Sequence, residues 1–496
     1  MRRIGVSTAR AHRPGQGRLA RAVLVVIGLC GALHAVAASV AELGGSYTPP
    51  TVMQTIAAQR LPAAAVSFLV LDPETGRPLT GLNVDQPRSP ASTVKVLTTY
   101  ASLDMLGPAY TWRTRALLRG ELDNGVLQGD LVLQGGGDPY MTLERWWSFA
   151  RALRSKGLRA IHGNIIIDNS QFAIADTDPG AFDGRPHRNY NVLPDALMVN
   201  FQNIEFRLVA NPATRKVDVV ADPLPSNLSI DNRVRFSTGR CRGPSRRVDF
   251  GVDTRDANRV SFTGMLSPDC AARSFNRVLM SPVDYAFGTF VTIWRELGGE
   301  FDGKLVQAPT PPEAQPFHSF DSLSLAEIVR LTNKYSSNLM ARHLLLTLGM
   351  EKYGAPGTPE KGAKAVQEWS AQRGIALADV DLDNGSGLSR ATRVSVTELA
   401  NVLNAALHSR YAPEFLSSLP LAGLDGTLRA RLRETPAGAV RLKTGHLNAV
   451  SGIAGFVTSN SGRTYVVVSL VNHVRADFGA GEPVHAALVD WVLENL

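Results

Sequence analysis

The chain has 496 residues, of which 44% are hydrophobic and 19% are charged. This length and composition exclude a fibrous or disordered protein and predict two or three domains, each with its own core. The net charge is +8, but six arginines and no acidic residues lie within residues 1–38. The remaining 46 basic and 44 acidic residues give about +2, which removes the compositional support for nucleic-acid binding.

The first 38 residues differ in composition from the rest of the chain. Their arginines precede an uncharged run, AVLVVIGLCGALHAVAASV, that ends in small residues. This order is typical of a secretory signal peptide, so we expect residues 1–38 to be removed and the protein to be secreted across the inner membrane into the periplasm. The alternative is an uncleaved membrane anchor, because the run is nearly long enough to span a bilayer.

The next segment predicts a strand, a turn at Asp72 to Pro78 and a second strand. A helix is expected from about Pro90 until Gly107 and Pro108 end it. Short alternating segments then continue to about residue 281, with a hairpin signal at Asn124-Gly125 and a single helix at LERWWSFARALRSKG. This texture predicts one or two β-rich modules.

Two of the three cysteines, Cys241 and Cys270, lie in this β-rich segment, and Cys30 lies in the leader. An even pair in a secreted chain favours a disulfide, and the alternative is two unrelated thiols. Histidines are scattered, without paired metal-binding motifs, so no metal and no cofactor are expected.

From residue 282 helical patterns return, at PVDYAFGTFVTIWRELGG and at SLSLAEIVRLTNKYSSNLMARHLLLTLG, which breaks at its two serines. Strand-like segments follow at AVRLKTGHLNAVSGIAGFV and TYVVVSLVNHV. The chain ends in an amphipathic helix whose polar face carries Asp490 and Glu494, which favours packing against the core over binding to a membrane surface.

Three short motifs occur in a fixed order along these elements: S-x-x-K at Ser92 and Lys95, S-x-N at Ser336 and Asn338, and K-T-G at residues 443–445. The first opens a helix, the second interrupts a helical pair and the third lies in a strand-like segment. Each motif is weak alone because it occurs by chance in chains of this length. Their order and positions together indicate a serine nucleophile site.

The spacing of the first motif has a chemical reason. A serine hydroxyl needs a base within hydrogen-bond reach, and a residue three positions further along a helix lies over the same face. Lys95 can act as that base only when its amine is neutral, which burial and a second cation such as Lys443 would favour. The simpler interpretation makes Ser92 a helix cap and Lys95 a solvated lysine.

The other two motifs would complete the chemistry. Ser336 would relay a proton to a leaving amine, and Asn338 would orient Lys95 and the substrate amide. Lys443 and Thr444 would bind an anionic group such as a terminal carboxylate, while Gly445 leaves room for a substrate strand. The simpler interpretations are a helix break for the S-x-N motif and an exposed strand end for K-T-G.

With these motifs in this order, the chain resembles the penicillin-binding proteins and serine β-lactamases. The 240 residues between Lys95 and Ser336 make it similar to the low-molecular-mass class C group, the D-alanyl-D-alanine carboxypeptidase/endopeptidases. Four further stretches look like the same group: LQGGGDPYMT, DNGSGLSR, LAGLDGTLRARL and KTGHLNAVSGIAGF.

The resemblance implies an α+β fold, the penicillin-binding/serine β-lactamase-like transpeptidase fold, with an antiparallel sheet flanked by helices and inserted β-rich domains. It predicts a discontinuous catalytic domain at 39–108 and 282–496, interrupted by an insertion at 109–281. It makes Ser92 the acylated nucleophile and Lys95 its base, with an oxyanion hole from the backbone N–H groups of Ser92 and His446. The implied substrates are peptidoglycan stem peptides, and β-lactams are the implied covalent inhibitors.

Two positions depart from the group's pattern. Ser337 stands where aspartate is frequent, and we expect little effect. His446 stands where serine or threonine usually follows K-T-G, and its bulk and charge at the mouth of the site would shift substrate preference. Glycine-rich stretches such as DNGSGLSR are expected to be turns, with Ser386 and Gly387 as cleft-lining alternatives.

Two other functions compete with the peptidase. A serine β-lactamase of class A needs a glutamate placed by a loop after S-x-N, and Glu351, Glu360 and Glu368 show no such arrangement. A non-catalytic peptidoglycan-binding scaffold would not need Ser92 and Lys95, and both are present. The sequence does not distinguish carboxypeptidase from endopeptidase activity, and it identifies no protein partner.

Overall fold

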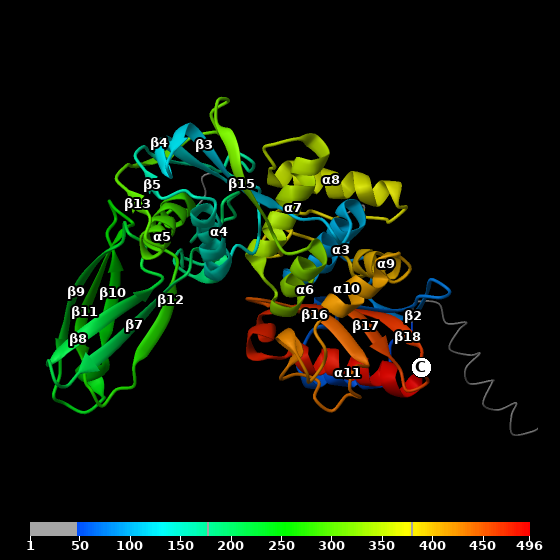
Figure 1. Cartoon of the computed structure of the whole chain (residues 1–496). Coiled ribbons are helices and arrows are strands. Elements are labelled where there is room, and N and C mark those ends of the chain that lie inside the picture. Colours follow the sequence, from blue (N-terminus) through cyan, green and yellow to red (C-terminus); the bar gives the residue numbers. More distant parts are fainter. Residues whose placement is uncertain (1–46, 176–177, 378–379) are drawn as a thin grey trace, which may run out of the picture.

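The computed structural model describes residues 47–175, 178–377 and 380–496. The leader predicted at residues 1–38 therefore lies outside the described residues. Within those ranges, no helix combines the length and the apolar character needed to cross a membrane. A helix-covered sheet lies at one end of the molecule and an elongated β-rich arm at the other (Figure 1).

The helix-covered end is built around one antiparallel sheet that joins the first and last strands of the chain. Its strands, in spatial order, are β16 (Val440–Leu447), β17 (Val450–Thr458), β18 (Thr464–Asn472), β1 (Val66–Asp72) and β2 (Arg77–Leu82). Every residue of β1 is buried because helices cover both faces of the sheet. This explains why β1 has a continuous apolar run instead of alternation.

Helices α2 (Pro50–Ala58) and α11 (Gly481–Asn495) cover one face. Val484, Leu488 and Val492 of α11 are fully buried there, which confirms the prediction that the last helix packs against the core. The expected α+β architecture, an antiparallel sheet between helices, is confirmed.

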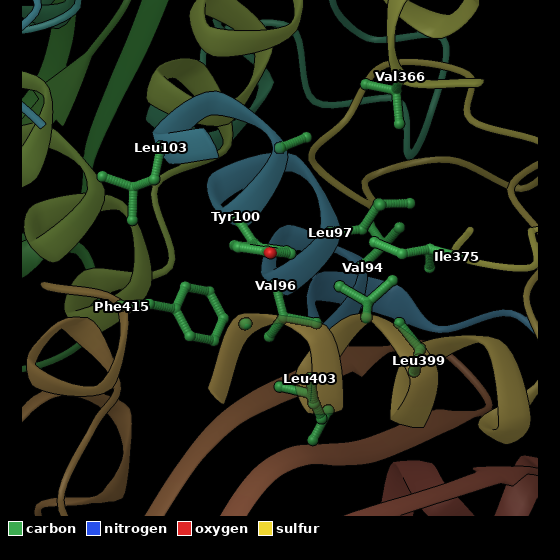
Figure 2. Packing of buried hydrophobic residues seen from close by; sticks show 14 of the residues in the cluster. Val94, Val96, Leu97, Tyr100, Leu103, Val366, Ile375, Leu399, Leu403 and Phe415 are labelled. Carbon is green, nitrogen blue, oxygen red and sulfur yellow. The ribbon is translucent and has the colours of Figure 1, made fainter. Parts of the chain in front are cut away.

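The opposite face carries the helix that follows Ser92, α3 (Lys95–Leu106), and α9 (Val396–Leu407). Figure 2 shows Leu97 and Tyr100 of α3 packed among Leu399, Leu403 and Phe415. The surrounding helices are α6 (Leu325–Tyr335), α7 (Asn338–Tyr353), α8 (Pro359–Gln372) and α10 (Ala412–Ser418). The first nine residues of α3 are all buried, so the helix has no solvated face on which Lys95 could lie.

Between these parts the chain forms a seven-stranded sheet. Its strands are β3 (Arg113–Asp123), β4 (Val126–Gln134), β5 (Ala160–Ile161), β6 (Ile165–Asp168), β13 (Glu300–Phe301), β14 (Leu305–Gln307) and β15 (Gln315–Asp321). The predicted Asn124-Gly125 hairpin joins β3 and β4, and both residues have positive φ (49° and 86°), as a two-residue type I′ turn requires. Helices α4 (Leu143–Ser155) and α5 (Pro282–Glu296) pack against this sheet.

The far end of the arm consists of two three-stranded sheets. One contains β9 (Ser229–Phe236), β10 (Val248–Val252) and β11 (Arg259–Leu266), and the other contains β7 (Ile204–Asn211), β8 (Lys216–Asp222) and β12 (Arg273–Arg277). Phe206, Phe250, Phe262 and Phe275 form a cluster of ring contacts between them. A disulfide joins Cys241 to Cys270, and their Cα atoms lie 5.0 Å apart.

The strand pairing bears on the residue at which the insertion ends, which the sequence analysis expects at 281. Strand β15 pairs antiparallel with β3, and β13 and β14 pair with β5 and β6, so residues 282–321 lie with the inserted sheet. The sequence pattern of α5 resembles any amphipathic helix and does not identify the sheet that it covers. We therefore propose that the insertion extends to Asp321.

Candidate active site

Ser92 lies in a single 3-10 turn, Ala91–Val94, that runs directly into α3. Ala91 has a left-handed backbone (φ 47°), and the stretch at residues 383–390 packs against it. A Cβ atom on Gly387 would come within 1.9 Å of the Ala91 carbonyl oxygen. Only glycine therefore allows this approach, which makes the DNGSGLSR stretch part of the wall beside Ser92.

Lys95 is fully buried, and its amine is held by three oxygen atoms from three segments. Its Nζ lies 2.9 Å from Ser92 Oγ, 2.8 Å from Asn338 Oδ1 and 2.5 Å from the Ser386 carbonyl oxygen. The predicted positions 92, 95 and 338 thus form one hydrogen-bonded group. The backbone oxygen of Ser386 is a further contact of Lys95. The sequence had suggested only that Ser386 could line the cleft.

The electrostatic environment favours the neutral form of Lys95. Burial is the main cause that holds its pKa well below the usual value for lysine, and the positive charges of Lys443 and Arg342 lower it further. A lysine with this environment can accept a proton from a neighbouring hydroxyl. Arg342 was not identified from the sequence, because no local motif marks its approach to Lys95.

The S-x-N segment forms a sharp break between two helices. Ser336 ends α6 in a left-handed conformation (φ 57°, ψ 37°), and Ser337 caps α7 by accepting a hydrogen bond from the Met340 N–H. Asn338 is the first residue of α7 and directs its side-chain oxygen to Lys95. Because of this break, the side chains of the three adjacent residues point in three different directions.

Lys443 links the second motif to the third. Its buried Nζ donates to Ser336 Oγ at 2.8 Å and to the Thr444 carbonyl oxygen at 2.6 Å. Burial, helped by the charge of Arg431, lowers its pKa to about 7. Ser336 and Lys443 thus form a second hydrogen-bonded group, which acts electrostatically on Lys95.

Strand β16 is the outer strand of its sheet, and at Gly445 one face of the strand lies against the Ser92 turn. At its start, Leu442 N–H and Val440 C=O form hydrogen bonds on the outer side. Backbone groups alternate along a strand, so Thr444 and His446 point their N–H groups to the same outer side. A Cβ atom on Gly445 would lie 3.1 Å from the Ser92 nitrogen and 2.7 Å from the Pro90 carbonyl oxygen, so glycine permits this close approach.

The other predicted positions lie elsewhere or play another part. The His446 side chain is exposed. Cys241 and Cys270 lie in the arm, which contains none of the motif residues. Among the described residues, no group of three or more His, Cys, Asp or Glu side chains could hold a metal ion. The arrangement supports nucleophilic chemistry at Ser92.

Comparison with known proteins adds a family match over nearly the whole described chain. The model of the D-Ala-D-Ala carboxypeptidase 3 (S13) family matches residues 50–494. The D-alanyl-D-alanine carboxypeptidase DacB of Haemophilus influenzae is 26% identical over 418 residues, which cover 84% of this chain and 87% of that protein. A D-alanyl-D-alanine carboxypeptidase of an Actinomadura species is 28% identical over 455 residues, with coverage of 88% and 82%.

A solved structure has the same fold. The crystal structure of penicillin binding protein 4 (dacB) from Haemophilus influenzae superposes with a TM-score of 0.76 at 25% identity, covering 89% of this chain and 99% of that one. The similarity therefore includes the inserted modules as well as the helix-covered sheet.

Proposed function

The chain belongs to the D-Ala-D-Ala carboxypeptidase 3 (S13) family, and we propose on this basis that it is a serine D-alanyl-D-alanine carboxypeptidase acting on peptidoglycan stem peptides. The observation that carries the proposal is the buried Lys95 amine, 2.9 Å from the hydroxyl of Ser92. The similar proteins from Haemophilus and Actinomadura carry the same activity in their names.

Acylation begins when Lys95 in its neutral form takes the proton of Ser92. The Ser92 oxygen then attacks the carbonyl carbon of the penultimate D-alanine, and the carbonyl oxygen becomes negative. Two backbone N–H groups, those of Ser92 and His446, are proposed to donate to this oxyanion. The close approach of Gly445 to the Ser92 nitrogen supports a common position for them.

The C–N bond then breaks and the leaving nitrogen needs a proton. Ser336 accepts a hydrogen bond from Lys443, so its own proton remains available for donation to that nitrogen. The proton that Lys95 took from Ser92 replaces it, and no net proton is left on the acyl-enzyme. Water then attacks the ester with Lys95 again as the base, which releases the shortened peptide and restores Ser92.

Lys443 and Thr444 are proposed to bind the terminal carboxylate of the substrate, with Asn338 orienting its amide. The same chemistry would cleave a cross-link whose leaving amine belongs to a second stem peptide, so endopeptidase activity is part of the proposal. β-lactams carry a strained amide next to a carboxylate and are expected to acylate Ser92. No cofactor enters these steps.

We place the mature protein in the periplasm. The basic and apolar leader in the sequence and the disulfide in the arm both favour an oxidising compartment outside the cytoplasm. Peptidoglycan is the substrate expected both from this location and from the family.

The test is the intact mass of the protein before and after incubation with benzylpenicillin, beside a Ser92→Ala variant. We expect a stable increase of one drug mass in the unaltered protein and none in the variant. An unmodified protein with intact drug would favour the scaffold alternative. An unmodified protein with hydrolysed drug would favour a β-lactamase.

A further inference from the structure

The stretch at residues 421–432 connects the second and third motifs, although none of its residues belongs to either. Asp425 accepts hydrogen bonds from the Lys334 ammonium at 2.6 and 2.9 Å, and Lys334 also donates to the Leu419 carbonyl oxygen at 2.7 Å. Only 4% of Lys334 is exposed, and it lies two residues before Ser336. An ion pair between the buried Lys334 and the half-buried Asp425 therefore fixes this stretch to the end of helix α6.

The next two residues bring the stretch to the active site. Gly426 has a left-handed backbone (φ +54°), and a Cβ atom there would lie 2.6 Å from the Lys334 carbonyl oxygen. This close turn is open only to glycine. It directs Thr427 toward β16, where the hydroxyl of Thr444 donates to the hydroxyl of Thr427 at 2.7 Å.

The Thr427 hydroxyl has donor capacity to spare. It accepts from Thr444, so its own proton is not used in that bond. Across residues 47–175, 178–377 and 380–496 it makes no other side-chain hydrogen bond. The side chain is half-buried, which leaves it open to a small ligand.

The surroundings of this hydroxyl pair are positive. Lys443 precedes Thr444, and Arg431 lies near enough for its charge to act on Lys443. Arg431 itself is paired with Glu482 at 2.8 Å. The unused proton of the Thr427 hydroxyl, beside a buried ammonium, suits a carboxylate, which accepts charge-assisted hydrogen bonds.

We propose that Thr427 is a further substrate-binding residue: its hydroxyl accepts from Thr444 and donates its own proton to the terminal carboxylate of the substrate. The Asp425–Lys334 pair positions it. This inference rests on the proposed function of the same site. The inference places a second hydroxyl group, from a separate segment of the chain, beside the K-T-G strand. The side chain of His446, which lies on the strand itself, has no hydroxyl group.

The test compares two acylating probes, benzylpenicillin and its methyl ester, by intact mass over time. Thr427→Val removes the hydroxyl and keeps the shape, and we expect the rate constant for benzylpenicillin to fall about 10- to 100-fold, the effect of losing a hydrogen bond to a charged group. The rate for the methyl ester should change less than about 2-fold. Thr427→Ser restores the donor and should recover most of the rate with benzylpenicillin.

Thr435→Val is the matched control, because that threonine lies in the next turn and its hydroxyl, among the residues that the structure describes, bonds only to the Leu432 carbonyl oxygen. It should leave both rates unchanged. Asp425→Asn should reduce the rate with benzylpenicillin more than the rate with the ester, because it loosens the position of Thr427.

Equal losses with both probes in Thr427→Val, or no loss with either, would overturn the inference while the proposed function stands. Absence of acylation of the unaltered protein by both probes would overturn the proposed function, and the inference with it. Circular dichroism of each variant checks that it is folded.

Discussion

The ammonium of Lys443 donates to the hydroxyl of Ser336 at 2.8 Å, although 107 positions separate the two residues. Lys443 also acts electrostatically on Lys95, which contacts Ser92. The first, second and third motifs are therefore coupled through two buried lysines. Changes at one lysine are expected to alter the protonation of the other.

Replacing Lys95 with arginine tests the need for a neutral base. Arginine keeps a positive charge at all accessible pH values, so it can neither accept the Ser92 proton nor fit the three oxygens that hold the lysine. We expect the acylation rate to fall about 100- to 10,000-fold, measured by intact mass with benzylpenicillin. Lys364→Arg, at an exposed position, is the control, and acylation of Lys95→Arg at the normal rate would contradict the assignment.

The rate of acylation is expected to pass through a maximum as the pH rises. It should rise as Lys95 loses its proton at a pH well below the usual pKa of lysine. It should fall above about pH 7, because the pKa of Lys443 is lowered to about 7 and its positive charge, which attracts the carboxylate, is then lost. Rate constants measured from pH 5 to 10 with benzylpenicillin check this, and a steady rise up to pH 10 would contradict it.

The adjacent serines 336 and 337 are expected to respond differently to alanine. Ser336→Ala removes the proposed proton donor and should lower the acylation rate about 100-fold with little change in stability. Ser337→Ala removes the cap of α7 and should cost about 1 kcal/mol of unfolding free energy with nearly unchanged acylation. Denaturant unfolding and acylation kinetics on both variants separate the roles, and the reverse pattern would refute them.

Removal of the disulfide should destabilise the arm alone. Cys241 and Cys270 are 29 positions apart, and a closed loop of this size contributes about 2–4 kcal/mol. A double substitution to serine should therefore increase proteolysis and hydrogen exchange within the two distal sheets. Acylation of Ser92 should proceed at the normal rate, and its loss would show that the arm and the site are coupled.

Local sequence signals predicted much of the fold and the chemistry. The Asn124-Gly125 turn and the helix after Ser92 follow from short-range preferences, and the motif spacing predicts that Lys95 reaches Ser92. Ser386, Arg342 and Thr427 could not be assigned in this way, because their approach to the site depends on contacts across the fold. The contact between Lys95 and Ser386, for example, spans 291 positions.

The end of the insertion that we propose, at Asp321, was not predicted from the sequence for a related reason. A strand such as β15 shows its own alternation but does not identify its partner strand. Its pairing with β3, about 200 residues earlier, therefore had no local signature. The stretch LAGLDGTLRARL did stand out in the sequence. Its Asp-Gly-Thr turn was the one signal from which the connection to Lys334 and Thr444 could have been suspected.

The pairing of β1 with β18 has a consequence for the timing of biogenesis. Val66 pairs with Val471, so β1 obtains one of its two neighbouring strands only after almost the whole polypeptide has been made. A growing chain can complete the arm first, since its sheets are closed by residues up to Asp321. The K-T-G strand reaches the Ser92 turn only near the end of synthesis, so a nascent or prematurely terminated chain has Ser92 and Lys95 but lacks the third motif of the site.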